Sequence, residues 1–219
     1  MGKICKRYNS AYCSKALKFL EITEINTSKS KISIILMFAV FISVAIFFVL
    51  NQFIVMPWEN SELPKLENPL LVVKKSERKL YVFDGEKLVK TYEISLGFAP
   101  VGDKKISGDG KTPEGEFYIF TKNARSKFYL SLGLSYPSAE DAERGLRENL
   151  ISKEEYDAIV QAINEKKMPP QDTNLGGAIY IHGGGIIKDW TWGCVALRDE
   201  EMKGIFDAVS IGTKISIVP

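Results

Sequence analysis

The sequence contains a single histidine, His182, and only three cysteines. This scarcity excludes several kinds of catalytic site. The segment "HGGG" that begins at His182 is also an oxyanion-hole motif of lipase-like hydrolases, but their triad needs a second histidine, and G-x-S-x-G is absent. A zinc site needs three or four ligands, and His182, Cys194 and Asp189 are a poor set without another histidine or cysteine. We therefore expect neither a hydrolase of that type nor a metal or other cofactor.

Excess positive charge is missing from most of the chain. Residues 1–57 contain seven Lys or Arg and two Glu, whereas residues 58–219 contain 22 basic and 25 acidic side chains. Without a basic stripe the second part is not suited to nucleic acid. The segment "GDGKT" is not a phosphate-binding loop, because G-x-x-x-x-G-K-[ST] needs a glycine where Lys105 stands. Neither nucleic-acid nor nucleotide binding is expected.

One long run without charge is present, from Ile32 to Leu50. As a helix it is long enough to cross about 30 Å of hydrocarbon. A cleaved signal peptide would have a shorter apolar region nearer the N-terminus, followed by a small-residue cleavage site. We predict a transmembrane anchor at 32–56 after a basic cytoplasmic tail at 1–31. The positive-inside rule then places the rest of the chain outside the cytoplasm.

The anchor is followed by a segment with three prolines and no hydrophobic periodicity, "PWENSELPKLENP" at 57–69. Such a composition is typical of a stiff, extended linker. At about 3 Å per residue it would hold the following domain, 70–219, within roughly 40 Å of the bilayer. The substrate of that domain is expected near the outer face of the membrane.

This topology separates the cysteines. Cys5 and Cys13 fall on the reducing side of the membrane, which leaves Cys194 without a disulfide partner on the oxidising side. An unpaired cysteine there is buried, pairs between chains or performs chemistry. The residue types alone leave these readings open, and a lone cysteine after a glycine is commonly a packed core residue.

The domain has the pattern of a mainly β fold, with an antiparallel sheet or sandwich and a few short helices. Short β-prone runs begin near residues 70, 79, 87, 116 and 128, and Asp84-Gly85 favours a hairpin turn. Capping-box patterns at Ser138 and Ser152 predict two short helices within 138–166, packed over one side of the sheet and ended by "MPP". Strands are expected again around His182, after Gly193 and at the C-terminus, with a last helix capped by Asp199.

His182 ends one apolar strand, and Cys194 begins the next after residues 183–193. The facing ends of two such strands can bring both side chains to one rim of the sheet. An adjacent imidazolium stabilises a thiolate and would activate the cysteine as a nucleophile. Structural roles for both residues remain the alternative at this point.

The motifs "IHGGG", "TWGCVAL" and "GDGKTPEGEFYI" together resemble the YkuD-type L,D-transpeptidase catalytic domain of bacterial cell-wall enzymes. The resemblance extends from about residue 68 to residue 219. It implies a nucleophilic Cys194 that forms a thioester with a peptidoglycan stem peptide, and His182 as its acid-base partner. It further implies that the Gly183 carbonyl orients the imidazole and that amides around Gly193 bind the oxyanion.

The sequence departs from the family pattern at two positions. Many members have an arginine where this chain has Ala196, and a histidine where it has Trp192. Arg198 is a candidate replacement for the missing charge, and Thr191 and Trp192 are candidate substrate-binding or architectural residues. Together with the predicted anchor and its orientation, the resemblance implies a membrane-anchored, extracytoplasmic transpeptidase of a bacterial cell. The alternatives are a hydrolase of the same fold and a non-catalytic wall-binding module.

Overall fold

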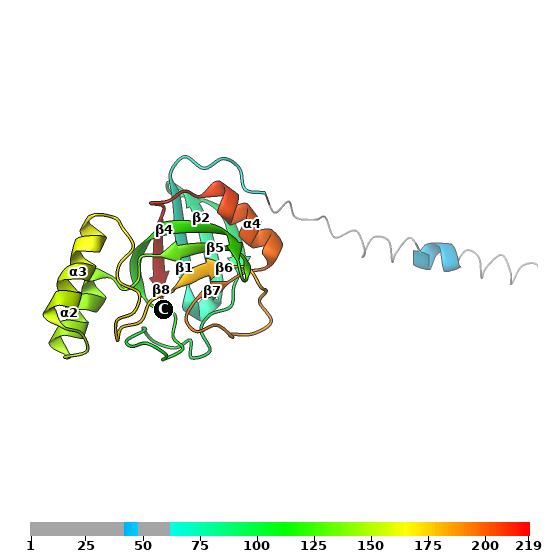
Figure 1. Cartoon of the computed structure of the whole chain (residues 1–219). Coiled ribbons are helices and arrows are strands. Elements are labelled where there is room, and N and C mark those ends of the chain that lie inside the picture. Colours follow the sequence, from blue (N-terminus) through cyan, green and yellow to red (C-terminus); the bar gives the residue numbers. More distant parts are fainter. Residues whose placement is uncertain (1–41, 48–61) are drawn as a thin grey trace, which may run out of the picture. The chain divides into compact units, whose positions relative to one another are not determined.

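The computed structural model of the chain describes residues 42–47 and 62–219 (Figure 1). Residues 42–47 are helical, and the rest of the predicted tail and anchor lies outside the described residues. No helix in the described ranges combines the length and the apolar character that a bilayer span requires. The anchor at 32–56 and its orientation therefore stay predictions.

Residues 62–219 belong to one compact unit, and their strands form an eight-stranded mixed sheet in the order β3-β2-β1-β8-β4-β5-β6-β7. The strands are β1 (Pro69–Lys74), β2 (Lys79–Asp84), β3 (Lys87–Glu93), β4 (Gly115–Ser126), β5 (Tyr129–Leu134), β6 (Tyr180–His182), β7 (Val195–Ala196) and β8 (Lys214–Val218). The mainly β fold is confirmed. Most neighbours are antiparallel as predicted, but β1 with β8 and β6 with β7 are parallel pairs.

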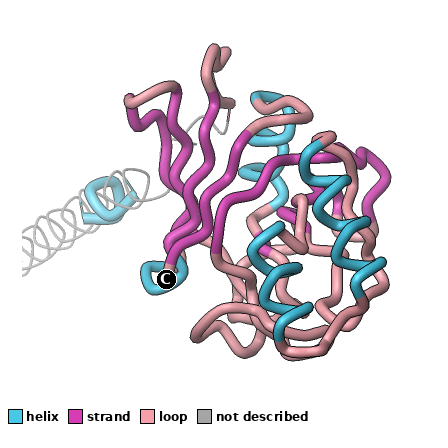
Figure 2. Tube along the Cα trace, turned by 90° about the vertical axis from the view of Figure 1, so that its left-hand side faces the viewer, coloured by secondary structure: helices cyan, strands magenta, loops and turns pink. Residues whose placement is uncertain are grey.

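Strand β4 connects the two halves of the sheet. Its first residues, Gly115–Tyr118, pair with β8, and the residues from Ile119 onward pair with β5. The register with β5 shifts after Ile119 and again after Asn123. Such irregularities bend a strand and increase its twist. Figure 2 shows the long strand leaving the first group of strands toward the helical side of the domain.

The main hydrophobic core lies along the sheet, and every strand contributes to it, β3 through Tyr92. Fully buried examples are Leu71, Leu80, Ile119, Leu132 and Ile181. The hairpin predicted at Asp84-Gly85 is confirmed, since Asp84 pairs with Lys87 and Gly85 has a φ of 59°. A glycine accepts this left-handed conformation at little cost.

Two helices, α2 (Ala139–Arg147) and α3 (Lys153–Asn164), lie side by side beside the sheet (Figure 1). Both predicted capping boxes are present, at Ser138 with Asp141 and at Ser152 with Glu155. The helices enclose a small core of their own around Ile159 rather than simply covering the sheet. Helix α3 also ends before "MPP", because the chain turns at Lys166, where φ is 52°.

The second half of the predicted linker contacts the domain instead of extending away from it. Leu63 and Leu66 pack against the main core, and the amides of Glu67 and Asn68 donate to the Asp84 carboxylate at 3.0 and 2.6 Å. A short 3-10 helix, η1 (Lys75–Glu77), and the helix α4 (Asp199–Ala208) complete the domain. Helix α4 packs on β5 and β6.

Candidate active site

Strand pairing brings His182 and Cys194 to the same end of the sheet. In the parallel pair β6–β7, Ile181 lies beside Val195 and His182 beside Ala196. Cys194 immediately precedes β7 and therefore lies beside Tyr180, two positions from His182. Because side chains alternate along extended strands, this offset places the cysteine and the histidine on the same face. The two side chains were predicted to meet where the facing ends of two strands come together. In the structure the two strands are instead parallel neighbours, connected by residues 183–194.

The Cys194 thiol rests against the main chain of the neighbouring strand. Its Sγ accepts a hydrogen bond from the Tyr180 amide at 3.4 Å and donates to the Ala178 carbonyl at 3.5 Å. Burial raises the pKa of this thiol from 9.0 to about 11, although the Tyr180 hydrogen bond and the Lys104 charge act in the opposite direction. The thiol is consequently protonated at neutral pH in the resting domain.

His182 is 3% exposed and is held on two sides. Its Nδ1 lies 2.6 Å from the Gly183 carbonyl oxygen, and its ring stacks on Phe128 with centroids 4.7 Å apart. Trp190 meets the imidazole edge-on at 5.5 Å. Burial lowers the pKa of His182, and the Gly183 hydrogen bond partly offsets this effect. A carbonyl only accepts hydrogen bonds, so Nδ1 carries the proton and Nε2 is the basic nitrogen.

The turn after His182 is fixed by Asp199. The Asp199 carboxylate accepts a hydrogen bond from the Gly184 amide at 2.8 Å. A Cβ atom at Gly183 would lie 2.4 Å from Asp199 Oδ1, so only glycine fits this approach. The predicted capping role of Asp199 is wrong, because Arg198 is the N-cap of α4 and Asp199 is its first residue. Its carboxylate holds the glycine turn instead of the helix terminus.

The loop between the histidine and the cysteine is fastened by Asp189. Arg78 binds the Asp189 carboxylate in a two-pronged ion pair, through Nε at 3.0 Å and Nη2 at 2.9 Å, and the Leu96 amide donates to it at 2.9 Å. Arg78 adopts a left-handed conformation with φ 54°. From the sequence, Asp189 is considered only as a poor metal ligand, and Arg78 is not predicted to have a role. No local pattern signals a pair whose members are 111 residues apart.

Thr191 and Gly193 shape the turn that precedes the cysteine. The buried Thr191 hydroxyl donates to the Cys194 carbonyl at 2.7 Å and accepts from the Gly193 amide at 3.1 Å. Thr191 is therefore an architectural residue here. The Gly193 amide predicted for the oxyanion is engaged with this hydroxyl in the resting domain, so its role toward substrate stays a prediction.

The structure separates the remaining predicted residues. Trp192 is 70% exposed and meets Phe98 edge-on, with ring centroids 4.9 Å apart, so it is accessible beside the cysteine. Ala196 is fully buried, and Arg198 pairs with Glu201 at 2.9 Å on the exposed start of α4. Arg198 is thus committed to its helix, and the structure gives no support to its replacing the charge missing at Ala196.

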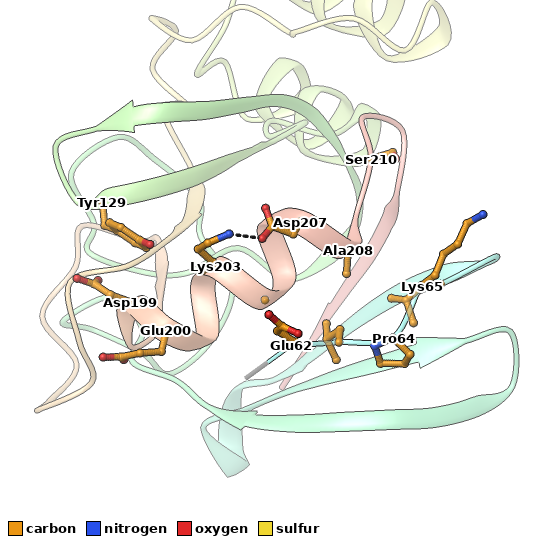
Figure 3. Close-up of a pocket in the computed structure, with 13 residues that line it drawn as sticks. Glu62, Pro64, Lys65, Tyr129, Asp199, Glu200, Lys203, Asp207, Ala208 and Ser210 are labelled. Carbon is orange, nitrogen blue, oxygen red and sulfur yellow. Dashed lines mark hydrogen bonds and ion pairs between the residues drawn. The ribbon is translucent and has the colours of Figure 1, made fainter. Parts of the chain in front are cut away.

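Two hollows of the domain differ in how they lie relative to Cys194 and His182. One, of about 770 Å³, lies between α4, Tyr129 and the segment 62–66 (Figure 3). It includes neither Cys194 nor His182, although Asp199 contributes to its wall. The other, of about 460 Å³, is lined by residues of β4 together with Met168 and Tyr180. Within the described part of the chain no group of three or more His, Cys, Asp or Glu side chains is placed to hold a metal.

Comparison with known proteins decides the family. The model of the L,D-transpeptidase catalytic domain, YkuD, matches residues 68–217. The chain belongs to this family. The probable L,D-transpeptidase YcfS of Escherichia coli (strain K12) is 27% identical to it over 164 residues, which are 71% of this chain and 46% of that protein. This YkuD-family chain thus spans about half the length of the curated relative that it matches.

Two solved structures are similar to this chain at lower sequence identity. The helical cell shape determining protein Pgp2 from Campylobacter jejuni is 21% identical, with a TM-score of 0.45 over 73% of this chain and 51% of that one. Bd1075 from Bdellovibrio bacteriovorus is 22% identical, with a TM-score of 0.46 over 73% of this chain and 52% of that one.

Proposed function

We propose that this YkuD-family chain is a cysteine acyltransferase that modifies peptidoglycan by acting on its stem peptides. The observation that carries the proposal is the placement of Cys194 and His182 on one face of the β6–β7 pair, with the imidazole oriented by Gly183. A thiol nucleophile beside a base that a third group orients is the arrangement of covalent acyl transfer. Membership of the YkuD family supports peptidoglycan as the material acted on.

The resting protonation states define the first step. Both side chains are neutral, because burial disfavours the thiolate and the imidazolium alike. His182 Nε2 therefore takes the thiol proton while Cys194 Sγ attacks the carbonyl carbon before the terminal D-residue of a stem peptide. Nδ1 keeps its proton on the Gly183 carbonyl throughout.

The tetrahedral intermediate then collapses to a thioester. The C–N bond breaks, and the imidazolium of His182 gives its proton to the departing amine. In the second half an amine from another stem, or a free D-amino acid, attacks the thioester carbonyl and transfers a proton to His182. The new amide forms, and Sγ regains its proton. Water in place of the amine would make the chain a hydrolase.

We also propose that the domain acts on the outer side of a bacterial cytoplasmic membrane. The support is the uncharged run from Ile32 to Leu50 and the seven basic residues that precede it. Fusion of a reporter that functions only outside the cytoplasm to the C-terminus, Pro219, tests this orientation. A reporter active in the cytoplasm alone would contradict it.

The acyltransferase proposal is tested by incubating the full-length chain with a stem tetrapeptide and measuring its intact mass and products. We expect a covalent adduct on Cys194, loss of the terminal D-residue and a new peptide bond when an amine acceptor is present. Cleavage without a new bond would favour the hydrolase, and binding that survives Cys194→Ala without any chemistry would favour the non-catalytic module. An unmodified protein under conditions in which another family member reacts would contradict the proposal.

A further inference from the structure

The hollow beside Tyr180 lies on the same face of the sheet as the catalytic pair. The strand registers form two rows across β4, β5 and β6: Thr121, Gly133, Tyr180 and Asn123, Ser131, His182. Residues directly opposite each other on neighbouring strands share a face, and the strands are about 4.8 Å apart. The backbone at Asn123 is therefore within roughly 10 Å of the backbone at His182.

The shape of this hollow depends on the absence of a side chain at residue 133. Gly133 has no side chain, and a Cβ atom there would lie 2.7 Å from the Phe120 ring, which covers the position. Phe120 and Tyr180 pack with ring centroids 6.5 Å apart, and Met168, 55% exposed, adds apolar surface. The Tyr180 amide is the group that donates to Cys194 Sγ, so the hollow begins next to the nucleophile.

The hollow has one cation that is not neutralised. No acidic residue lines it, and its basic residues are Lys122 and Arg125. Lys122 is engaged on the opposite face, where its Nζ donates to the Val209 carbonyl at 2.7 Å. The backbone amide of Arg125 is fixed by the Asn123 side chain at 2.9 Å, but within residues 62–219 no carboxylate pairs with its guanidinium. Its charge is therefore available to a ligand.

We propose that this hollow binds a carboxylate of the peptide substrate and that Arg125 is its direct partner. A guanidinium offers two parallel N–H donors, which match a carboxylate in geometry and charge. Phe120, Tyr180 and Met168 then contact the apolar atoms next to that carboxylate. The inference rests on the proposed function and adds a substrate-positioning charge on β4, distant in sequence from Ala196 and Arg198.

Equilibrium binding tests the inference without any turnover. Full-length chain carrying Cys194→Ala is titrated with a stem tetrapeptide and with the same peptide amidated at its terminal or at its side-chain carboxylates. Adding Arg125→Gln should weaken binding of the unmodified peptide roughly 10- to 100-fold, the range for a lost charged hydrogen bond. One amidated peptide should bind weakly to both proteins, and that peptide identifies the carboxylate that Arg125 holds.

Lys127→Gln is the matched control, since it removes the same charge from the adjoining turn and Lys127 does not line the hollow. Arg125→Lys should recover only part of the affinity, because a lysine has no two-pronged geometry. Equal affinities for the Arg125→Gln and Lys127→Gln proteins, or no peptide binding at all, would overturn the inference. Binding that depends on Arg125, in a chain whose wild type leaves every stem peptide intact, would refute the proposed function and leave the inference standing.

The rate at which iodoacetamide alkylates Cys194 separates binding from thiol chemistry. Arg125→Gln should leave this rate unchanged, because the probe carries no carboxylate for Arg125 to bind. A changed alkylation rate together with unchanged peptide affinity would assign Arg125 to the thiol environment and overturn its role in substrate binding.

Discussion

His182 Nδ1 lies 2.6 Å from the carbonyl oxygen of Gly183, the next residue in the chain. This contact fixes the tautomer of a buried, neutral imidazole and leaves Nε2 as a base. The peptide unit that contains this carbonyl is held from its other side, because the Gly184 amide donates to the Asp199 carboxylate at 2.8 Å. The glycines after the histidine therefore orient the imidazole through the main chain, and no carboxylate within residues 62–219 hydrogen-bonds to the ring.

The reactivity of Cys194 should depend on pH in two distinct ways. Burial raises the pKa of the thiol to about 11, so direct alkylation by iodoacetamide should increase with pH and reach half its maximum near that value. Acylation by peptide needs only neutral His182, whose pKa is lowered, so its rate should stay level at neutral pH and fall in acid. An alkylation rate that is already at its maximum at neutral pH would instead show a thiolate-imidazolium pair.

Removal of the Thr191 hydroxyl should impair both folding and acylation. Thr191→Val leaves the Gly193 amide and the Cys194 carbonyl without their partner, at a cost of about 1–3 kcal/mol in the free energy of unfolding. Thr191→Ser should restore both properties. Thr213→Val is the control, since that hydroxyl accepts from the Ser210 amide at 3.1 Å in the turn after α4. It should lower stability and leave the acylation rate per folded molecule unchanged, and equal losses of activity in the two valine variants would contradict the assignment.

The strand pattern could be predicted because it is local. The alternation of apolar residues, the Asp84-Gly85 turn and the serine caps at 138 and 152 each depend on neighbours within a few positions, and all are present in the structure. The direction of the β6–β7 pair could not be predicted in this way. It depends on how residues 183–193 are fastened to distant parts of the chain.

In the candidate site, too, only the features that depend on residue type or on a local motif could be predicted. The only histidine and the only cysteine of the domain were identified from residue type and motif. The fastening of Asp189 by Arg78 was not, because an ion pair across 111 residues leaves no periodic signal. The ion pair of Arg198 with Glu201 likewise depends on Arg198 being the N-cap of α4, a position that was predicted for Asp199.

Neutralising Asp189 should loosen the loop that carries the cysteine. Asp189→Asn keeps an acceptor for the Leu96 amide but loses the charge that holds Arg78. We expect a loss of about 1–2 kcal/mol in unfolding free energy and a fall of roughly tenfold or more in acylation, since small displacements of reacting groups are costly. Denaturant titration and single-turnover acylation measure the two effects.

Glu93→Gln provides the comparison for Asp189→Asn. It removes one carboxylate from the exposed pair with Lys79, whose atoms are 3.8 Å apart. An exposed pair of this kind contributes about 0–1 kcal/mol, so both stability and acylation should stay close to wild type. If the two variants behaved alike, Asp189 would have no role in positioning Cys194.

Gly183→Ala should lower the acylation rate much more than it lowers the stability of the domain. The added Cβ would lie 2.4 Å from Asp199 Oδ1 and 2.9 Å from the Phe128 carbonyl oxygen, so the turn must move and the Gly183 carbonyl with it. His182 then loses the acceptor that fixes its tautomer, and the acylation rate should fall about 100-fold or more. Gly212→Ala, where φ is 89° and the space is open, should cost only about 1 kcal/mol of stability. A Gly183→Ala chain that acylates at the wild-type rate would show that orientation of His182 by the main chain is dispensable.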